Sequence, residues 1–563
     1  MSDRPRSLPL LPTQKRPMLR LFSTVLPAVL LAALAGPAAA QKPITGTDLW
    51  AEYVKSSDTH PNIPNCSYAG VFRGEKPLPA PTVGTDVKQH GAKGDGKADD
   101  TEAFKKALQS TAAKGGAVAV PAGTYRISQQ LVIPSWVVLR GEGPGKTVLN
   151  FVRPLEQILG KIEENKSSVW SWAGGMIWIG SPDTFRPDGK VAPHLADRIQ
   201  GWEYWRPSAT LAKVSKPAKR GDRTVEVDKA DGFKPGQLVM LSWENPADAS
   251  FLKHVAGHPS MEAYNWKSAT WILPPIYPRW QWPAEIESVK GNTVTLAQPL
   301  RVDIRAEWNV EVADPGPRVE NAGVEDLQIL LESPKEHKHL KCVGWNGVYF
   351  NRAYNCWAKN VRITAAENPV IFSAAKNCTV EKLVIDGDPM NHHSVAMRVN
   401  SHDNLVKDFV VKGMWRVKHG INVEWLSSGN VYSKGTMEKG TFDSHRALSF
   451  DLIRTEITLT NEADGPGGAG QAGPFIGARV AHWNIRVLAA KPSPTNMNAP
   501  GDFVFMPFTF PLGAFVGIQG AEVSNKVRDT TPGEKGSIIA DEGVVPAITN
   551  LYEAQLKLRL FKQ

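Results

Sequence analysis

The most constraining feature of this sequence is a run of similar segments after residue 318, each alternating apolar and polar residues and each closed by a polar turn. They read VENAGVEDLQILLE, NGVYFNRAYNCWAKNVRIT, NPVIFSAAKNCTVEKLVID, HSVAMRVNSHDNLVKDFVV, HGINVEWLSSGNVYSKG and HRALSFDLIRTEITL. Aligning Val348, Val370, Val395, Ile421 and Ala447 gives repeats of 22, 25, 26 and 26 residues. Repeats of this length bury their apolar face only against their neighbours. The sequence therefore predicts a β-solenoid, which can accommodate a chain of 563 residues in one long body.

The same alignment places polar residues in two files that run along the predicted coils. The first file contains Asn346, Asn368, His393, His419 and His445, and the second contains Asn355, Asn377, His402 and Ser428. Neighbouring parallel strands lie about 4.8 Å apart, so equivalent side chains can touch. Ladders of asparagine at the bends of such coils are normally structural. The change from asparagine to histidine leaves two interpretations open, a buried structural ladder or a site for chemistry.

The first forty residues are typical of a segment that is removed during export. Lys15, Arg16 and Arg20 precede an apolar run, and small residues precede Gln41, which predicts cleavage after Ala40. No later stretch reaches about 18 uninterrupted apolar residues, so we expect no membrane span in the mature chain. The four cysteines are too few for a disulfide-built scaffold. We expect a secreted or periplasmic protein.

The chain is basic, with a net charge of +9 and a pI near 9.1. A positive field attracts polyanions such as acidic polysaccharides or nucleic acids, although it is also compatible with an ordinary solvated surface. Because no nucleic-acid-binding motif is visible and the chain is predicted to be exported, we expect an acidic polysaccharide as the partner and no nucleic acid. The sequence makes no prediction of the oligomeric state.

Residues 84–204 follow an irregular lead-in at 41–83 and are predicted to form the first coils with a capping helix. The segment DVKQHGAKGDGKADDTEAFKKAL, followed by GGAVAVPAGTYRI and LRGEG, resembles the N-terminal signature of pectate-lyase-superfamily proteins. That resemblance implies an all-β fold, a right-handed parallel β-helix with a helix covering its open end. The same opening occurs in lyases, glycoside hydrolases, uronan epimerases and phage tailspikes. We interpret Asp95, Asp99 and Asp100 as part of this structural device.

Residues 205–312 interrupt the repeats with alternating strands joined by Gly-Asp, Pro-Gly and Gly-Asn turns, which predicts an inserted antiparallel β subdomain. Four tryptophans lie between these strands: Trp266, Trp271, Trp280 and Trp282. Indole faces are common platforms for sugar rings, and they also pack cores. The sequence leaves both interpretations open. The coils then resume over 313–563.

Cations and histidines are concentrated at 393–446, and they favour β-elimination on a uronate-containing polysaccharide. Removal of the C5 proton of a uronate requires neutralisation of its carboxylate, a base and protonation of the leaving oxygen. The predicted catalytic residues are His393, Lys412, Arg416, His419 and His445. In this hypothesis His419 or a neighbouring cation takes the proton, Arg416 holds the carboxylate, and His393 and His445 act as acid or subsite contacts. The predicted substrate-binding residues are Arg398, Trp415, Arg446, Trp271, Trp280 and Trp282, although Arg398 and Glu424 could instead form a cross-coil ion pair.

Two other functions remain open at this point. A glycoside hydrolase needs two carboxylates, for which the chain offers Asp386, Asp388, Asp403 and Asp408, but neither the aspartate signature of polygalacturonase-like enzymes nor the Asp-Pro-His-Glu signature of uronan epimerases is present. A non-catalytic carbohydrate-binding or adhesin-like solenoid is the second alternative. Calcium is a candidate cofactor because Asp386 and Asp388 resemble the remnant of a calcium site. The sequence predicts no other metal ligands.

Overall fold

The computed structural model describes residues 43–164, 166–184, 203–334, 338, 340–387, 393–412, 419–460, 467–488, 510–521, 523 and 536–562. The predicted export segment, residues 1–40, lies outside the described residues. Residues 44–563 form one compact unit. None of the helices in the described ranges combines the length and apolar content that crossing a membrane requires.

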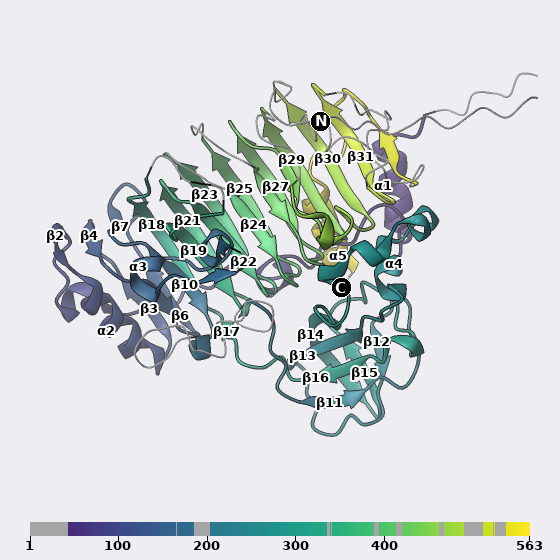
Figure 1. The fold of residues 1–563 in the computed structure, drawn as a ribbon, viewed down its shortest axis with the longest axis horizontal. Helices are drawn as coiled ribbons and strands as arrows, with labels where there is room; N and C mark the ends of the chain where they lie inside the picture. The colour runs from purple at the N-terminus through teal and green to yellow at the C-terminus, as the bar shows by residue number, and fades with distance from the viewer. Residues whose placement is uncertain are drawn as a thin grey trace, which may run out of the picture. The chain divides into compact units, whose positions relative to one another are not determined.

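Two long parallel sheets run along the molecule, and their strands stack coil upon coil (Figure 1). The fifteen-stranded sheet contains β1 (Val83–Asp86), β2 (Asp95–Asp99), β3 (Gly116–Ala119), β4 (Gly123–Ile127), β6 (Val137–Arg140), β7 (Thr147–Phe151), β18 (Gly323–Leu331), β21 (Trp357–Thr364), β23 (Thr379–Asp386), β25 (Leu405–Val411), β27 (Val431–Met437), β29 (Leu452–Leu459), β30 (Val480–Val487), β31 (Ala514–Gln519) and β32 (Ile538–Ala540). The seven-stranded sheet contains β5 (Leu131–Ile133), β10 (Ile177–Gly180), β19 (Asn346–Asn351), β22 (Asn368–Ser373), β24 (Val395–Arg398), β26 (Ile421–Val423) and β28 (Phe442–Ser444). The architecture is a right-handed parallel β-helix, as the sequence predicted.

Shorter elements complete the fold. The helices are α1 (Gly46–Lys55), α2 (Thr101–Ala112), α3 (Leu155–Leu159), α4 (Ser250–Ala256) and α5 (Leu551–Lys562). Two small pairs join β17 (Val319–Glu320) to β20 (Ala353–Tyr354) in parallel and β8 (Glu163–Glu164) to β9 (Ser167–Ser168) in antiparallel orientation. Inward-facing aliphatic and aromatic residues of both long sheets form the principal core, as the alternating pattern requires.

The strand register confirms most of the predicted alignment and corrects its last step. Val348 pairs with Val370, Val370 with Val395 and Val395 with Ile421. Ile421 then pairs with Phe442, so the prediction that Ala447 occupies this position is wrong. Phe442 fills the inward position in the core, whereas Ala447 lies beyond the strand and packs against the inserted subdomain. Both segments carry buried apolar residues, which is why the pattern alone did not separate them.

The second predicted file is displaced by one residue after its first two members. His402 forms bridges with Lys376 and Ser428, not with Asn377. Lys376 follows Val370 by six residues, but His402 follows Val395 by seven, so the later coil contains one extra residue. Two successive residues with positive φ, Val399 and Asn400, occur where this residue is accommodated.

The N-terminal opening is a structural cap, as expected. Helix α2 packs its buried face, including Phe104, against the first coils, and Phe104 meets Tyr125 edge-on with ring centroids 5.2 Å apart. Asp100 accepts hydrogen bonds from the main-chain N–H groups of Lys93 and Gly94 at 2.6 and 3.0 Å. These contacts hold the glycine-rich loop against the N-terminus of α2. Asp100 therefore has a structural role.

The inserted antiparallel sheet is present and has its own core. It contains β11 (Thr210–Lys213), β12 (Thr224–Glu226), β13 (Leu238–Glu244), β14 (Arg279–Lys290), β15 (Thr293–Leu296) and β16 (Glu311–Ala313). Its hydrophobic cluster continues into the coils through Trp425, Leu426 and Phe450. A buried ionic network adds to this contact: Asp403 of the coils pairs with Arg301, which follows the inserted sheet's β15, and with Lys376. The insertion is therefore fastened to the coils by apolar packing and by buried charge.

Candidate functional site

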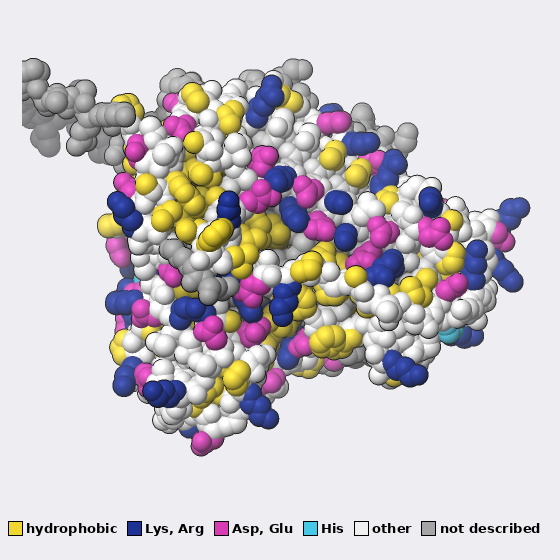
Figure 2. Space-filling view, turned by 180° about the vertical axis from the view of Figure 1, so that it is seen from behind, with side chains coloured by type: hydrophobic (Ala, Val, Ile, Leu, Met, Phe, Trp, Pro, Cys, Tyr) yellow, Lys and Arg dark blue, Asp and Glu magenta, His cyan; other side chains and the backbone are white. Residues whose placement is uncertain are grey.

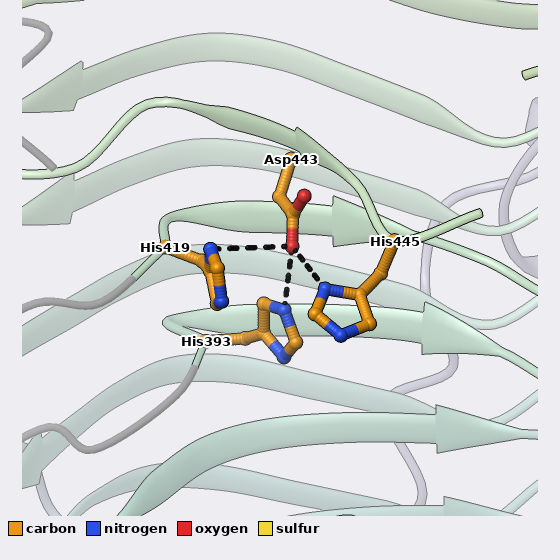
Figure 3. A group of neighbouring side chains, drawn as sticks. All are labelled: His393, His419, Asp443 and His445. Atoms are coloured by element: carbon orange, nitrogen blue, oxygen red, sulfur yellow. Dashed lines mark hydrogen bonds and ion pairs between the residues drawn. The ribbon is translucent and has the colours of Figure 1, made fainter. Parts of the chain in front are cut away.

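Four titratable side chains converge on the outward side of the seven-stranded sheet (Figure 3). We call His393, His419, Asp443 and His445 the His–Asp cluster. Oδ2 of Asp443 lies 2.8 Å from Nε2 of His393, 2.8 Å from Nδ1 of His445 and 3.7 Å from Nδ1 of His419. The ring centroids of the three histidines lie 5.1 to 5.2 Å from one another. The cluster is therefore a compact set of three imidazoles around one carboxylate oxygen.

Two of the histidines continue the predicted asparagine file. Asn368 donates its amide to Oδ1 of Asn346 at 2.9 Å, and Asn346 in turn donates to the main-chain carbonyl of Trp170 at 2.9 Å. His393 and His419 take the same position on the next coils and stack with their planes 25° apart. The file is thus a structural ladder at its asparagine end and becomes part of the His–Asp cluster at its histidine end.

His445 reaches the cluster by a different route from the predicted one. Because Phe442 pairs with Ile421, the residue equivalent to His419 on this coil is Gly440. His445 follows the end of β28, and its main-chain N–H donates to the carbonyl of Val423 and to Oδ1 of Asn422, each at 3.2 Å. The prediction that His445 belongs to the file is wrong in register, although its ring does join the other two histidines.

Asp443 is the member of the His–Asp cluster that the sequence analysis missed. Within β28 it pairs with Asn422 of β26, and neighbouring Phe442 faces the core, so alternation turns Asp443 outward. The erroneous alignment through Ala447 began this coil at His445 and so left Asp443 outside the aligned segments. Reading TFDS as a short strand in register with Ile421 would have revealed it.

Burial and mutual charge perturb the pKa values within the His–Asp cluster. Burial lowers the pKa of His393 to about 4, and this outweighs the hydrogen bond to Asp443. For His445, burial acts to lower the pKa, but the Asp443 charge and hydrogen bond outweigh it and raise the pKa above its usual value. Burial acts to raise the pKa of Asp443, but the neighbouring histidines hold it well below its usual range. Asp443 is therefore an ionised carboxylate with no exposed side-chain surface.

A glycine covers the cluster. The main-chain N–H of Gly467 donates to Oδ1 of Asp443 at 3.1 Å. A Cβ atom at position 467 would lie 2.5 Å from Cε1 of His445 and 2.8 Å from Cε1 of His419. Only glycine allows the backbone to approach the two rings this closely.

The Arg398 prediction as a substrate contact is wrong. Its guanidinium is buried, pairs with Glu424, and donates to Oε1 of Glu203 at 2.8 Å and to the carbonyl of Trp172 at 2.7 Å. These partners occupy the group, so the cross-coil pair with Glu424 that the sequence left open is present. Arg398 instead supports Trp172, whose ring lies 5.6 Å from the guanidinium carbon.

Trp172 is a second residue that the sequence analysis did not identify. It is half-buried, and its ring centroid lies 6.2 Å from that of His445. No repeat or alternating pattern marks it, because it follows a short 3-10 turn, Val169–Ser171. The ring offers an aromatic surface directly beside the His–Asp cluster.

The predicted tryptophan platform is mostly core. Trp280 and Trp282 have no exposed surface, so the prediction that they contact substrate is wrong. The indole of Trp280 donates to the carbonyl of Leu426 at 3.0 Å, and Trp282 lies under the ammonium group of Lys376. Trp266 is also buried. Trp271 is 36% exposed and lies parallel to Trp425 at 6.4 Å, and its role in binding stays a prediction.

The other predicted cations and Trp415 differ in their surroundings. Arg446 is half-buried, with its guanidinium 3.8 Å from the ring centroid of Phe475 and donating to the carbonyls of Gly468 and Gly473. Lys412 is exposed at the end of β25. Arg416 and Trp415 lie outside the described residues. Roles of these residues in catalysis or binding stay predictions.

The suggested remnant of a calcium site receives no support. Asp386 accepts a hydrogen bond from Thr364 at 2.7 Å and pairs with Arg362 at 2.6 Å, so an arginine occupies its carboxylate. Asp388 lies outside the described residues.

The basic residues are not gathered on the face that Figure 2 shows, where lysine and arginine alternate with aspartate and glutamate.

Comparison with known proteins gives a family match near the N-terminus. The model of the family described as rhamnogalacturonase A/epimerase, pectate lyase-like, matches residues 84–167. The preneck appendage protein of Bacillus phage PZA is 45% identical over 69 residues, covering 12% of this chain and 8% of that protein. Alginate lyase 7 of Azotobacter vinelandii is 44% identical over 75 residues, covering 12% of this chain and 9% of that protein. The chain thus matches less than a tenth of the length of either relative.

Among solved structures, the tailspike protein gp49 from Pseudomonas phage LKA1 aligns with a TM-score of 0.44 and 13% identity, covering 72% of this chain and 62% of that one. The family match covers the capping helix and the first coils, which are the segments that carried the resemblance in the sequence. Over residues 84–167 the chain is thus similar to this pectate-lyase-like family, and its two long parallel sheets form the β-helix that the sequence resemblance implied.

Proposed function

We propose that this protein is an exported polysaccharide lyase that cleaves a uronate-containing polysaccharide by β-elimination at the His–Asp cluster. The observation that carries the proposal is the convergence of three imidazoles and one carboxylate on the outward side of the coils. A buried arrangement of this kind costs desolvation energy, and such clusters concentrate at functional sites. Among the relatives that match over a short segment, one is named an alginate lyase and another a mannuronan C5-epimerase, which supports a carbohydrate as substrate.

In this proposal the positive charge beside the uronate carboxylate, which is the first requirement of β-elimination, is presented by His445, the most exposed ring of the cluster. In the reaction the C5 proton leaves to a base, the C4–O4 bond breaks, a C4–C5 double bond forms, and O4 takes up a proton. Neutralising the carboxylate makes the C5 proton more acidic, and preorganised positive charge does this most effectively in a water-poor site. The sequence-based assignment of the base to His419 or a neighbouring cation stays a prediction.

Two residues define where the sugar meets the cluster. His445 has the most exposed side chain of the four, at 12%, against 9% for His419 and 4% for His393. The half-buried ring of Trp172 lies beside it. A sugar ring stacked on Trp172 would bring its carboxylate toward the imidazole of His445.

The carboxylates around the cluster favour elimination over hydrolysis. A glycoside hydrolase uses two carboxyl groups that both reach the scissile bond. In the described part of the site, Asp443 is fully buried by its histidines and Gly467, while Glu203 and Glu424 pair with Arg398. None of the three presents the exposed carboxyl oxygen that hydrolysis needs.

The test is to incubate the purified protein with a panel of uronate polysaccharides, including alginate and polygalacturonate. We expect the ultraviolet absorbance of unsaturated uronate to rise with the wild type and with His90→Ala, a control in the N-terminal 3-10 turn. We expect His445→Ala to lose this activity. New reducing ends without absorbance would instead identify a hydrolase, and binding without cleavage would identify a carbohydrate-binding solenoid.

A further inference from the structure

We propose that the His–Asp cluster is a binding site for one divalent transition-metal ion, with His393, His419, His445 and Asp443 as its ligands. The four candidate ligand atoms all lie within 4.8 Å of one another. They come from three successive coils, so the strand register fixes their separation. This inference does not depend on lyase activity and goes beyond it.

The spacing of the ligand atoms suits a tetrahedral ion. With metal–ligand distances of about 2.0–2.2 Å, two ligands of a tetrahedral centre lie about 3.4 Å apart. The three nitrogen atoms lie 2.8, 2.8 and 3.7 Å from Oδ2 of Asp443. Side-chain shifts of less than about 1 Å would bring these separations to the tetrahedral value.

The donor set selects the class of metal. Three imidazoles with one carboxylate suit zinc, iron, cobalt or nickel, whereas calcium takes six to eight oxygen ligands. Calcium, the candidate cofactor from the sequence, therefore does not fit this cluster. We expect zinc or a similar ion.

The surroundings hold the ligands in place. Gly467 donates its N–H to Oδ1 of Asp443, which leaves Oδ2 directed at the histidines. Outer hydrogen bonds of this kind orient metal ligands in known sites. The main-chain contacts of His445 with Val423 and Asn422 likewise fix the backbone that carries its ring.

A purely structural histidine ladder explains the geometry less well. In the asparagine part of the file, side chains bond to main-chain carbonyls and to each other. In the His–Asp cluster, one nitrogen of each ring instead points at a single carboxylate oxygen. An ion between that oxygen and the three nitrogen atoms would bind all four ligands together. Its bound charge would also neutralise a uronate carboxylate, in which case the C5 base lies outside the four ligands.

The test measures metal binding on the full chain, independently of activity. The protein is stripped with a chelator and titrated with Zn²⁺ by calorimetry, and the Co²⁺ form is examined for the intense visible absorption of a tetrahedral site. We expect one ion per chain in the wild type and in the His90→Ala control. We expect His419→Ala and Asp443→Asn to weaken binding by at least about 100-fold, since changing outer partners alone costs 10–100-fold.

Circular dichroism establishes that each variant is folded, and His445→Ala replaces any variant that is not. A wild type that binds no stoichiometric ion overturns the proposal, and so does binding that is unchanged in the folded variants. Stoichiometric binding by a chain that cleaves no polysaccharide supports the metal site and counts only against the lyase function.

Discussion

Nε2 of His393 lies 2.8 Å from Oδ2 of Asp443, although fifty residues separate them in the sequence. Two steps of parallel pairing, β24 with β26 and β26 with β28, bring these residues together. The contact therefore depends on the register of β28, the short strand that ends the seven-stranded sheet. Substitutions near β28 should therefore disturb the geometry of the His–Asp cluster while the fold remains intact.

Replacing His419 by alanine tests whether the histidine end of the file is functional. We expect turnover on the substrate that the wild type cleaves to fall by about 10²–10⁴. The variant loses either the base or one ligand of the metal ion whose charge would neutralise the uronate carboxylate. Circular dichroism checks folding. A folded His419→Ala protein with near-normal turnover would show that the file is a structural ladder throughout.

Gly467→Ala should disturb the cluster without removing any of its four residues. The new Cβ atom would meet Cε1 of His445 at 2.5 Å, so the ring or the backbone must move. We expect loss of turnover and of metal affinity with little change in melting temperature. Gly470→Ala is the matched control, since nothing lies within 4 Å of its Cβ position. Equal activity of the two variants would contradict this role of Gly467.

Trp280→Ala should destabilise the protein and leave glycan binding by the folded fraction unchanged. Trp280 is fully buried and packs against Trp243 and Phe251, so we expect the unfolding free energy to fall by about 3–5 kcal/mol. Urea denaturation measures the change, with the exposed Trp271→Ala as comparison. Unchanged stability together with weakened binding would restore the sugar-platform interpretation.

The sequence predicted those parts of the structure that repeat. The pairing of Val348, Val370, Val395 and Ile421 follows from the repeat, since a shift by one residue would turn these aliphatic side chains out of the core of the coils. The pattern failed at β28, because three residues carry too little alternation to compete with the apolar residues that follow. Because that strand was not recognised, Asp443 was not identified either.

The tryptophan prediction failed for a different reason. Trp280 and Trp282 are two residues apart in β14 and share a face with Ala284 and Ile286, which are all buried. Alternation within RWQWPAEIES therefore contained the signal for a core position, whereas aromatic content alone cannot distinguish a core from a sugar platform. The contact of Trp172 with the cluster depends on a turn without any repeat, so no pattern could have placed it.

Trp172→Ala tests the aromatic surface beside His445. Because the ring would contact substrate without taking part in bond cleavage, we expect a higher KM with a much smaller change in kcat. Trp136→Ala, at an exposed position near the first coils, is the control. If Trp172→Ala lowers kcat and leaves KM unchanged, the ring positions the cluster and does not bind the sugar.

The ionic network that fastens the insertion should make stability sensitive to acid. Asp403 is buried, pairs with Arg301 and Lys376, and accepts a hydrogen bond from Gln298 at 3.1 Å. Burial acts to raise the pKa of Asp403, but the two cations outweigh it and lower the pKa well below its usual value. The folded state therefore holds the proton less tightly than the unfolded state, whose pKa is about 3.9. The resulting stabilisation is present above about pH 4 and is lost as the pH falls toward the folded pKa.

Asp403→Asn removes this dependence, takes from Lys376 its carboxylate and leaves Arg301 with the more distant Asp451, at 3.7 Å. We expect its unfolding free energy at pH 7 to be about 3–5 kcal/mol lower than that of the wild type, the usual cost of breaking a buried ion pair. We also expect the difference to shrink as urea denaturation is repeated from pH 5 to pH 3, because protonation removes the wild-type advantage. Asp231→Asn, at an exposed position, should follow the wild type throughout. If Asp403→Asn and the wild type differ by the same amount at every pH, Asp403 does not act through its charge, and apolar packing alone fastens the insertion.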